Sequence, residues 1–542
     1  MTCVVIGSGP SGTQTALTLL KRGKRVELWD VGRKESPFPN PEATFHELKS
    51  VLQDPQEYFL GRNFETLLPP DAGELFRYPS ARSFLLEESD TAWPFATGLF
   101  RPFISLAQGG LAAGWGANAL SYDEDDLQDW PIHFSDLSDA YAETFRRIAV
   151  AGPQEDDLSS FFPGLRITQP AVHLSLHDQT LLKTYQNRRG RFQKKWGLHL
   201  GQARLAVVND SHSTNACRYC GRCLWGCPYS ALYNPAQVTL MECQKYPHFS
   251  YKGDRLVLSM EVSQGKVTGV RYRDMLAGEE RVEPCERVFL AAGALQSGAI
   301  FLRSLKNDER VLSGQIRGTR THSVMDTRVI KIPYLQLRSV GNGEESNQFQ
   351  LNRLILAHRK SWDGAWPSHI HGEVLSLNTL LYHPLVESIP LGSRASLKLF
   401  FHLKPALGVI SLFFPDKQWK DNGLSLETAP DSLTGDRVRV HYQEPDKKEE
   451  YIRNVVQDVR SAFVRMGCIP WGGLKGRPGA GIHYAGTIPM GEGPLCVDTR
   501  GRSHAFENLY VADGAAFPSL PSKSITTTLM AHAIRVATLA QV

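Results

Sequence analysis

The sequence has no apolar run of transmembrane length and no block of like charge that resembles a binding arm. Its 60 Lys and Arg residues are nearly balanced by 56 Asp and Glu residues, and a net charge of +4 does not favour a nucleic-acid partner. No export segment is visible, because Met1 leads almost directly into CVVIGSGPSG, which is typical of a buried strand and turn. We therefore expect a cytoplasmic protein with reduced thiols, no transmembrane segment and no nucleic-acid partner.

Cysteine is scarce, with nine residues in 542, yet four of the nine fall within NACRYCGRCLWGCPYSAL, residues 215–232. Cys217, Cys220, Cys223 and Cys227, followed by Pro228, have the spacing C-x2-C-x2-C-x3-C-P of bacterial ferredoxins. A reducing compartment disfavours a disulfide here and favours a metal or redox role. The run predicts one iron–sulfur cluster, 3Fe-4S or 4Fe-4S, while a zinc site and a structural loop of reduced or paired thiols stay open.

The run leaves the ligands of such a cluster undecided. In ferredoxins with two clusters the fourth cysteine serves the other cluster, and this chain has no second run. One cluster could use all four thiols, could take three and lose an iron, or could recruit Cys243 or His212. We expect the remaining cysteines to be packing residues: Cys3, Cys285, Cys468 and Cys496.

The first thirty residues predict a strand, a glycine turn, a helix and a second strand. Gly7, Gly9 and Gly12 have the G-x-G-x-x-G spacing, and the second strand ends at Asp30. In this arrangement Gly7 makes the tight turn, Gly9 lets the backbone approach a pyrophosphate, and Gly12 lets helix and strand pack closely. The helix N-terminus attracts the phosphates, and Asp30 can accept hydrogen bonds from a ribose diol. The motif predicts a dinucleotide site without distinguishing NAD from FAD.

Further along the chain, residues 253–292 predict a meander of strands, made of RLVLSMEV, KVTGVRYRD and ERVFLAAG. LGVISLFF and DRVRVHY predict strands in the middle region. Apolar residues at helical spacing from Ile452 to Met466 predict a helix with a buried stripe, which Gly467 can end. The segment RTHSVMDTRVIKIPY is either a strand that lines a substrate pocket or an ordinary sheet strand.

Five separated segments resemble the glucose–methanol–choline (GMC) oxidoreductases, flavoenzymes that oxidise alcohols. The segments are the glycine turn above, GGLAAGWGAN, VFLAAGALQS (residues 288–297), HYAGTIPMG from His483, and NLYVADGAAFP (residues 508–518). They span nearly the full chain in the family's order, whereas the middle third carries no motif that aligns.

The resemblance implies an α/β (α+β) fold with two parts. A Rossmann-like FAD-binding domain with a parallel sheet would comprise residues 1–150, 200–300 and 475–542, with a cysteine-rich loop at 215–230. A substrate-binding domain with a mixed antiparallel sheet would comprise residues 151–199 and 301–474. The predicted cofactor is FAD, and its contacts would be Gly7, Gly9, Gly12, Asp30, Gly109, Gly110, Gly114, Trp115, Asn118, Ala292, Gly293, Asp513 and Gly514.

In the family, the histidine of the fourth segment takes the proton of the alcohol, which implies His483 as general base. The family also places a His or Asn six residues after the proline of the fifth segment, and here that position is Ser524. Serine can donate a hydrogen bond to the substrate oxygen or accept one from it, but it is not a base at neutral pH. Lys523 could add charge beside it, and Pro489 replaces the family's usual Arg.

The resemblance and the cysteine run together predict an FAD-dependent dehydrogenase or oxidase of a CH–OH group. The substrate would be a small alcohol such as a sugar or a polycyclic metabolite, with hydride passing to flavin N5. Electrons would leave through an iron–sulfur cluster to an acceptor protein or quinone, or go to oxygen if no cluster is present. Ser524 keeps two alternatives open: a non-catalytic flavin and iron–sulfur relay or sensor, and a redox-neutral flavin-dependent isomerase.

Overall fold

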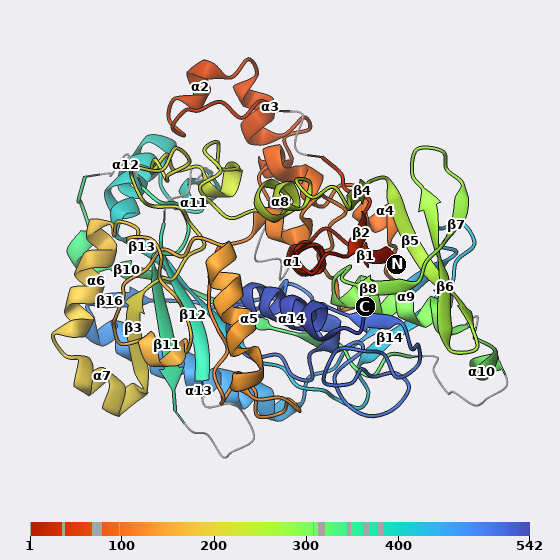
Figure 1. Ribbon diagram of the computed structural model, residues 1–542. Helices are drawn as coiled ribbons and strands as arrows, with labels where there is room; N and C mark the ends of the chain where they lie inside the picture. Colours follow the sequence, from red (N-terminus) through yellow and green to blue (C-terminus); the bar gives the residue numbers. More distant parts are fainter. Residues whose placement is uncertain are drawn as a thin grey trace.

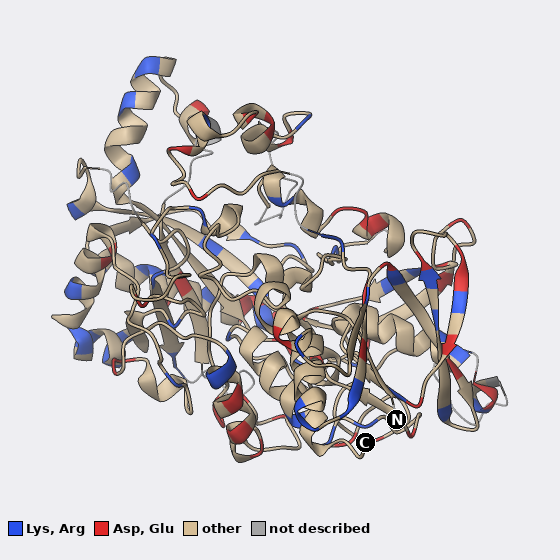
Figure 2. Cartoon of the chain, turned by 45° about the horizontal axis from the view of Figure 1, so that its top comes forward, with Lys and Arg blue, Asp and Glu red and all other residues tan. Residues whose placement is uncertain are grey.

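The computed structural model describes residues 2–34, 38–67, 78–96, 98–306, 308–312, 320–343, 348–360, 369–377 and 383–542. Within these ranges no helix combines the length and hydropathy that crossing a lipid bilayer requires. Figure 1 shows the two ends of the chain meeting beside the same sheet, at the right of the molecule. Figure 2 shows basic and acidic residues interspersed over the elements of that view.

A five-stranded parallel sheet joins three distant parts of the chain. Its order is β19 (Leu509–Val511), β8 (Arg287–Leu290), β1 (Thr2–Ile6), β2 (Arg25–Trp29) and β4 (Phe249–Lys252). The central strands are apolar almost throughout, as expected for parallel strands covered on both faces. Helices α1 (Pro10–Lys21) and α14 (Thr526–Leu539) pack on one face, where Leu17 and Val536 join Val5 and Phe289 in one core.

A second, antiparallel sheet lies beside the first. It contains β5 (Arg255–Ser263), β6 (Lys266–Asp274) and β7 (Glu280–Pro284). The predicted meander is therefore correct for its first two strands and wrong for the third. The segment ERVFLAAG pairs in parallel with β1 instead, since its buried run Val288–Leu290 fits the centre of a parallel sheet. The half-exposed β7, which the sequence analysis missed, completes the meander.

The largest sheet is antiparallel and comes mostly from the middle of the chain. Its order is β16 (Cys468–Pro470), β10 (Arg328–Gln336), β13 (Leu407–Phe414), β12 (His369–Ser376), β11 (Leu354–Arg359) and β3 (Leu198–Gln202), with β17 (Leu474–Lys475) also pairing with β10. The predicted strand LGVISLFF is β13, and DRVRVHY forms β15 (Asp436–His441), which pairs with β14 (Gly423–Thr428).

Successive side chains of this sheet point to opposite faces, and the two faces differ. Ile330, Leu356 and Leu412 on one face pack against the buried stripe of α13 (Asp446–Arg465) and against α6 (Leu176–Gln186) and α7 (Arg189–Trp196). The stripe predicted from Ile452 to Met466 is confirmed as core. The opposite face carries Lys331, Glu373 and Phe413 and borders the main cavity of the molecule.

The remaining elements connect and cover these sheets. The helices are α2 (Leu48–Val51), α3 (Pro55–Leu60), α4 (Ser89–Ala92), α5 (Phe134–Arg147), α8 (Met241–Cys243), α9 (Ala294–Lys306), α10 (Glu309–Leu312), α11 (His383–Glu387) and α12 (Ser393–Leu403). Two short strands, β9 (Met325–Asp326) and β18 (Tyr484–Ala485), pair with each other next to His483. The observed architecture is the mixed α/β class predicted from the sequence, with one parallel and several antiparallel sheets.

Candidate active site

The first wall of the site is the glycine turn between β1 and α1. Gly7 has a φ of +101°, and a Cβ there would lie 2.4 Å from the Ala291 carbonyl oxygen. A Cβ on Gly12 would lie 1.8 Å from the Gly7 carbonyl oxygen, so Gly12 serves the close packing of helix and strand. Gly9 is different, because its Cβ would meet only the Gly109 carbonyl oxygen, at 4.0 Å. Space is thus left free at the one glycine that should face a pyrophosphate.

The carboxylate at the end of β2 also faces this turn. Asp30 lines the cavity, and the Ser8 hydroxyl donates a hydrogen bond to it. Burial raises the pKa of Asp30 to about 7, against the opposing effect of the Ser8 hydrogen bond. Ser8 in turn accepts a hydrogen bond of 2.9 Å from the Gly109 backbone N–H, which ties the first glycine segment to the second.

The other predicted cofactor segments converge on the same space. Gly110, Gly114, Trp115, Asn118, Ala292, Gly293, Asp513 and Gly514 all line the cavity, whereas Gly12 and Gly109 do not. Asp513 accepts hydrogen bonds from the Ser297 hydroxyl (2.6 Å) and from the backbone N–H groups of Gly293 (2.8 Å) and Ala515 (2.9 Å). Burial raises its pKa to about 6. Segments separated by hundreds of residues thus form one cradle.

The cavity has a volume of about 470 Å³, within the range of about 300–1,000 Å³ usual for small-molecule sites. It extends from the glycine turn to the inner face of the antiparallel sheet. The residues present fit a dinucleotide cofactor: the open space at Gly9, the uncapped N-terminus of α1 and the Asp30 carboxylate meet at one end.

His483 lies in the same cavity, on a chain segment that enters β18. Its ring stacks on Phe413 of β13, with 5.8 Å between ring centroids. Its Nδ1 atom is buried and has no hydrogen-bond partner among the described residues. Burial lowers the pKa of His483 to about 4, so the ring is neutral at physiological pH and can accept a proton.

This pKa predicts how flavin reduction depends on pH. With a neutral alcohol as substrate, the rate should hold as pH falls through 6.5 and decline only toward pH 4, where His483 becomes protonated. Anaerobic stopped-flow measurement of flavin reduction across this range checks it. A loss of rate centred on pH 6.5 would contradict the lowered pKa that burial gives to His483.

Ser524 also lines the cavity, but the predicted contribution of Lys523 to it is wrong. The Lys523 ammonium is fully buried on the other side of the loop, 3.0 Å from Asp123 and 2.5 Å from Asp126, and it donates to the Phe161 carbonyl. Two carboxylates surround this single buried cation. Asp123, Asp126 and His369 have the spacing of metal ligands. The Lys523 ammonium already supplies the positive charge that a metal ion would bring to this group.

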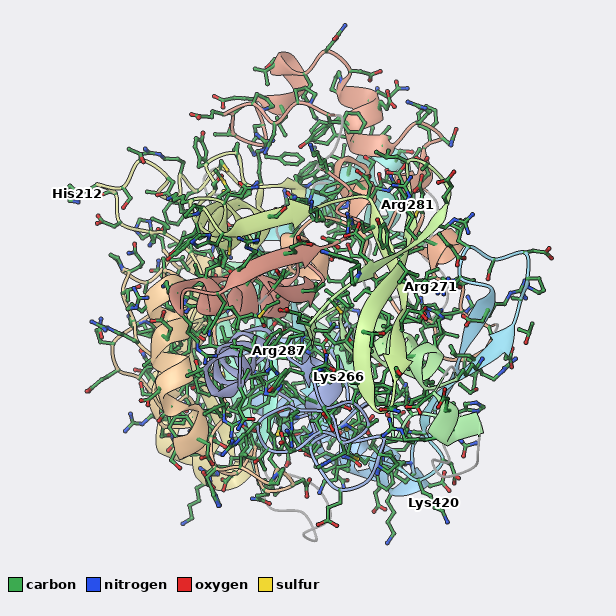
Figure 3. The ribbon with its side chains drawn as sticks, turned by 45° about the vertical axis from the view of Figure 1, so that its right-hand side comes forward. His212, Lys266, Arg271, Arg281, Arg287 and Lys420 are labelled. Atoms are coloured by element: carbon green, nitrogen blue, oxygen red, sulfur yellow. The ribbon has the colours of Figure 1, made fainter. Side chains whose placement is uncertain are left out.

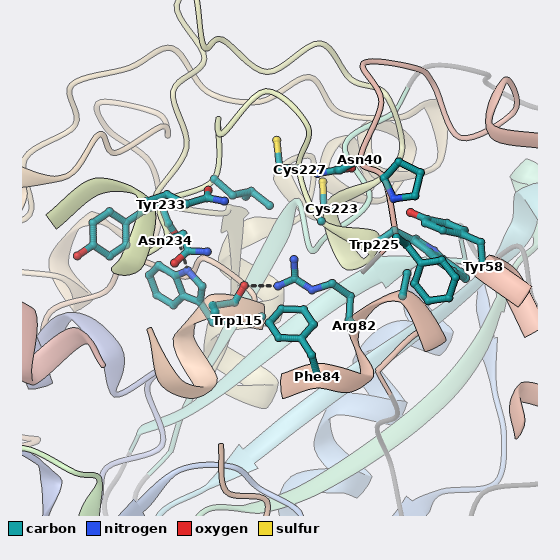
Figure 4. Close-up of a pocket in the computed structure, with 18 residues that line it drawn as sticks. Asn40, Tyr58, Arg82, Phe84, Trp115, Cys223, Trp225, Cys227, Tyr233 and Asn234 are labelled. Atoms are coloured by element: carbon teal, nitrogen blue, oxygen red, sulfur yellow. Dashed lines mark hydrogen bonds between the residues drawn. The ribbon is translucent and has the colours of Figure 1, made fainter. Parts of the chain in front are cut away.

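The cysteine run forms a loop directly behind the cavity wall. Leu224, inside the run, lines the cavity, and its N–H donates to Gln350 at 2.9 Å. Cys223, Cys227 and Trp115 line a smaller adjoining hollow, where Figure 4 shows Cys223 and Cys227 on the same side. Trp115 and Gly114 border both spaces. The loop therefore lies next to the predicted flavin turn.

The four thiols converge, although without the spacing of a zinc site. Burial raises the pKa of Cys217 to about 12 and raises those of Cys220 and Cys223, and the neighbouring cysteines of the run raise all three further. No three of the four sulfurs lie within 4.8 Å of one another. A tetrahedral zinc with bonds of about 2.3 Å requires a closer approach than a cubane with irons at separate corners. All nine cysteines are free thiols.

The two other ligands considered for a cluster do not reach this loop. Cys243 is buried in the core between α1 and the parallel sheet, against the Thr13 carbonyl. His212 extends into solvent, as Figure 3 shows, with its side chain 92% exposed and bound to Asp210.

The sequence analysis missed the wall opposite the glycine turn. Val329, Lys331, Glu373, Leu375, Ser411 and Phe413 line the cavity from β10, β12 and β13. The segment RTHSVMDTRVIKIPY is therefore a pocket strand as well as a sheet strand. Alternating side chains in VIKIPY were the available signal, because Val329 and Lys331 share a face that Ile330 and Ile332 do not.

Comparison with known proteins defines the class. Residues 421–533 match the GMC oxidoreductase family model, which includes the His483 and Asp513 segments. The match of this C-terminal part to the GMC oxidoreductase model confirms the family resemblance seen in the motifs. Members of this family are FAD-dependent, which supports FAD over NAD.

Individual relatives agree with this class. The chain is 23% identical to 6'''-hydroxyparomomycin C oxidase of Streptomyces lividus, over 98% of this chain and 89% of that protein. It is 22% identical to paromamine 6'-oxidase of Streptomyces fradiae, over 98% and 90%. C-glycoside 3-oxidase of Arthrobacter globiformis is 24% identical over 53% of this chain and 52% of its own length. The crystal structure of pyridoxine 4-oxidase from Mesorbium loti shares the fold, with a TM-score of 0.59, 14% identity, and coverage of 99% of this chain and 98% of that chain.

Proposed function

We propose that this protein is an FAD-dependent oxidoreductase that oxidises a CH–OH group of a small sugar-like alcohol. The observation that carries the proposal is the single cavity, with the dinucleotide cradle at one end and a buried, neutral imidazole in its wall. The relatives named as oxidases of sugar-containing compounds support the reaction class and the kind of substrate.

The roles of the chain's residues follow from their positions. FAD, when bound, supplies the acceptor for the hydride of the alcohol carbon. The free Nδ1 or the Nε2 of His483 takes the hydroxyl proton, and the Ser524 hydroxyl holds the substrate oxygen. Asp30 and the N-terminus of α1 bind the ribose and phosphates of the cofactor, and Asp513 fixes the turn beneath it.

We also propose the two-part organisation predicted from the sequence. The parallel sheet draws strands from residues 2–29, 249–290 and 509–511, which supports a discontinuous FAD-binding domain. The antiparallel sheet, which draws its strands from residues 328–475 and from β3, supports a separate substrate-binding domain. Nine unpaired thiols support a reducing compartment such as the cytoplasm.

The reaction is tested by mixing the anaerobic protein with a panel of alcohols and sugars and following the visible absorbance of the oxidised flavin. Bleaching by an alcohol, with one carbonyl product per flavin, supports the proposal. Silence across the panel with reduction by a protein donor would favour the relay, and product formed without any acceptor consumed would favour the isomerase.

For the route out of the site, we propose that Cys217, Cys220, Cys223 and Cys227 hold one iron–sulfur cluster, 3Fe-4S or 4Fe-4S. The mutual electrostatic influence of the four thiols supports it, as does the hollow that Cys223 and Cys227 share with Trp115. Protein purified without oxygen should contain about three irons per chain for a 3Fe-4S cluster or about four for a 4Fe-4S cluster. Its electron-spin resonance spectrum should be that of the same cluster.

Replacing Cys223 with Ser should remove the iron signal and leave the flavin bound. Cys496→Ser, at a buried thiol outside the run, is the matched control and should keep the iron. Iron-free wild-type protein that passes electrons to oxygen and makes peroxide would contradict the cluster. Bound zinc in its place would favour the structural alternative.

A further inference from the structure

The wall of the cavity opposite the glycine turn contains a row of polar side chains across three strands. Lys331 of β10 pairs in register with Ser411 of β13, and Ser411 pairs with Glu373 of β12. All three side chains point to the cavity face of the sheet, and all three line the cavity. Val329, Phe413 and Leu375 flank the row on the same face and are apolar. His371, two residues before Glu373, also lies on this face, where it is buried with its ring 5.7 Å from the Phe413 ring between centroids. The row is therefore the polar band among the residues of this wall that line the cavity.

Glu373 is the acidic side chain at the substrate end of the cavity, and it has acceptor capacity left over. The Asn118 amide donates a single hydrogen bond of 2.6 Å to its Oε1, and Asn352 holds Asn118 at 2.9 Å. Asp513, by contrast, accepts three hydrogen bonds, and Asp30 is bound by Ser8 at the cofactor end. Within the described part of the chain, Glu373 forms no ion pair with Lys, Arg or His inside 4.0 Å.

A buried, ionised carboxylate with one hydrogen-bond donor is energetically costly unless a cation or further donors stabilise its charge. Burial is the main influence on Glu373 and raises its pKa to about 7, while the more distant Lys331 lowers it only in part. A ligand ammonium would restore the missing charge and add the strong hydrogen bonds of a charged donor. A neutral hydroxyl would add a donor without the charge.

The polar row lies close enough to His483 for one small substrate to contact both. Phe413, on which His483 stacks, is two residues beyond Ser411 on β13. Two residues along a strand and one strand across separate Glu373 from Phe413 by about 8 Å between backbones. A molecule of about one sugar ring can therefore reach both His483 and Glu373.

We propose that Glu373 binds an ammonium group of the substrate, so that the alcohol oxidised beside His483 belongs to a small amine-bearing polyol such as an amino sugar. This inference rests on the proposed function for the site and adds the substrate class. Asn118 links the two halves of the site, since it lines the cofactor cavity and holds Glu373.

The test compares three probes that differ at one position: methyl glucosaminide, methyl N-acetylglucosaminide and methyl glucoside. Anaerobic stopped flow gives kcat/KM for flavin reduction, and titration of flavin absorbance in the absence of turnover gives Kd. We expect the free amine to be preferred over both neutral probes by about 100-fold or more. Glu373→Gln should remove most of that preference, by lowering kcat/KM for the free amine far more than for the two neutral probes.

Glu279→Gln is the matched control, because it removes the same charge from an exposed turn far from the cavity. Equal flavin content and melting temperature show that both variants fold. Equal use of amine and neutral probes, unchanged in Glu373→Gln, would overturn the inference and leave the proposed function standing. Amine binding that depends on Glu373 without flavin reduction would uphold the inference and overturn the function. No binding and no reduction would overturn both.

Discussion

Replacing His483 with alanine should leave the flavin bound and slow its reduction by the alcohol about 10²- to 10⁴-fold, the usual contribution of a general base. His483 is the imidazole of the cavity wall, and its lowered pKa keeps it neutral and able to accept a proton at working pH. Its ring packs on Phe413 and makes no hydrogen bond through Nδ1 to the described residues, so removing it costs little in cofactor binding. Single-turnover stopped flow with the oxidised protein measures the effect directly.

His504→Ala is a suitable control, since His504 is exposed and its Nε2 atom forms a hydrogen bond with the Gly491 carbonyl oxygen. That variant should reduce its flavin at the wild-type rate. If His483→Ala reduced its flavin as fast as wild type, the proton would have to go elsewhere, and His483 would lose its assigned role.

The second large effect concerns the cofactor itself. Gly9→Val should give a folded protein that has lost FAD affinity by about 100-fold or more, equivalent to roughly 3 kcal/mol. Gly9 has an ordinary φ of −63°, and its Cβ would meet no protein atom closer than 4.0 Å. The branched side chain would instead fill the space in which a pyrophosphate reaches the N-terminus of α1. Titration of the apoprotein with FAD, followed by flavin fluorescence, gives the affinity.

The matched control is Gly392→Val, at a helix N-cap with φ −64° and no atom within 4 Å of an added Cβ. Both variants should keep the melting temperature of wild type within a few degrees, about the shift expected from less than 1 kcal/mol. Full FAD content in Gly9→Val would show that the cofactor does not approach the chain at this turn.

Much of the cofactor end of the site could be predicted because its constraints are local. Gly7 needs a positive φ, and Gly12 needs the absence of a Cβ, so both requirements are visible as residue types at fixed spacing. The segments around Asn118, Gly293 and Asp513 were predicted from their resemblance to family motifs, and all three residues line one cavity in the structure. Parallel pairing of β8 with β1 was not visible, since an apolar run fits a meander as well as a buried parallel strand.

The substrate end could not be predicted for a physical reason. Lys331, Glu373 and Ser411 meet only through the register of three strands that are far apart in sequence, and no local spacing encodes that register. The side to which the Lys523 side chain points could not be predicted either. Its partner Asp123 lies 400 residues earlier in the chain, and its partner Asp126 lies close to Asp123. Adjacent residues on one loop, Lys523 and Ser524, thus serve a buried ion cluster and the cavity respectively.

The most direct test of the account is the visible spectrum and FAD content of the purified protein, before and after reconstitution with added FAD. The convergence of both chain ends on one cradle predicts a yellow protein that holds one FAD per chain and releases it on denaturation. A colourless protein that takes up no FAD when folded would contradict the account, whatever the cysteine loop is found to bind.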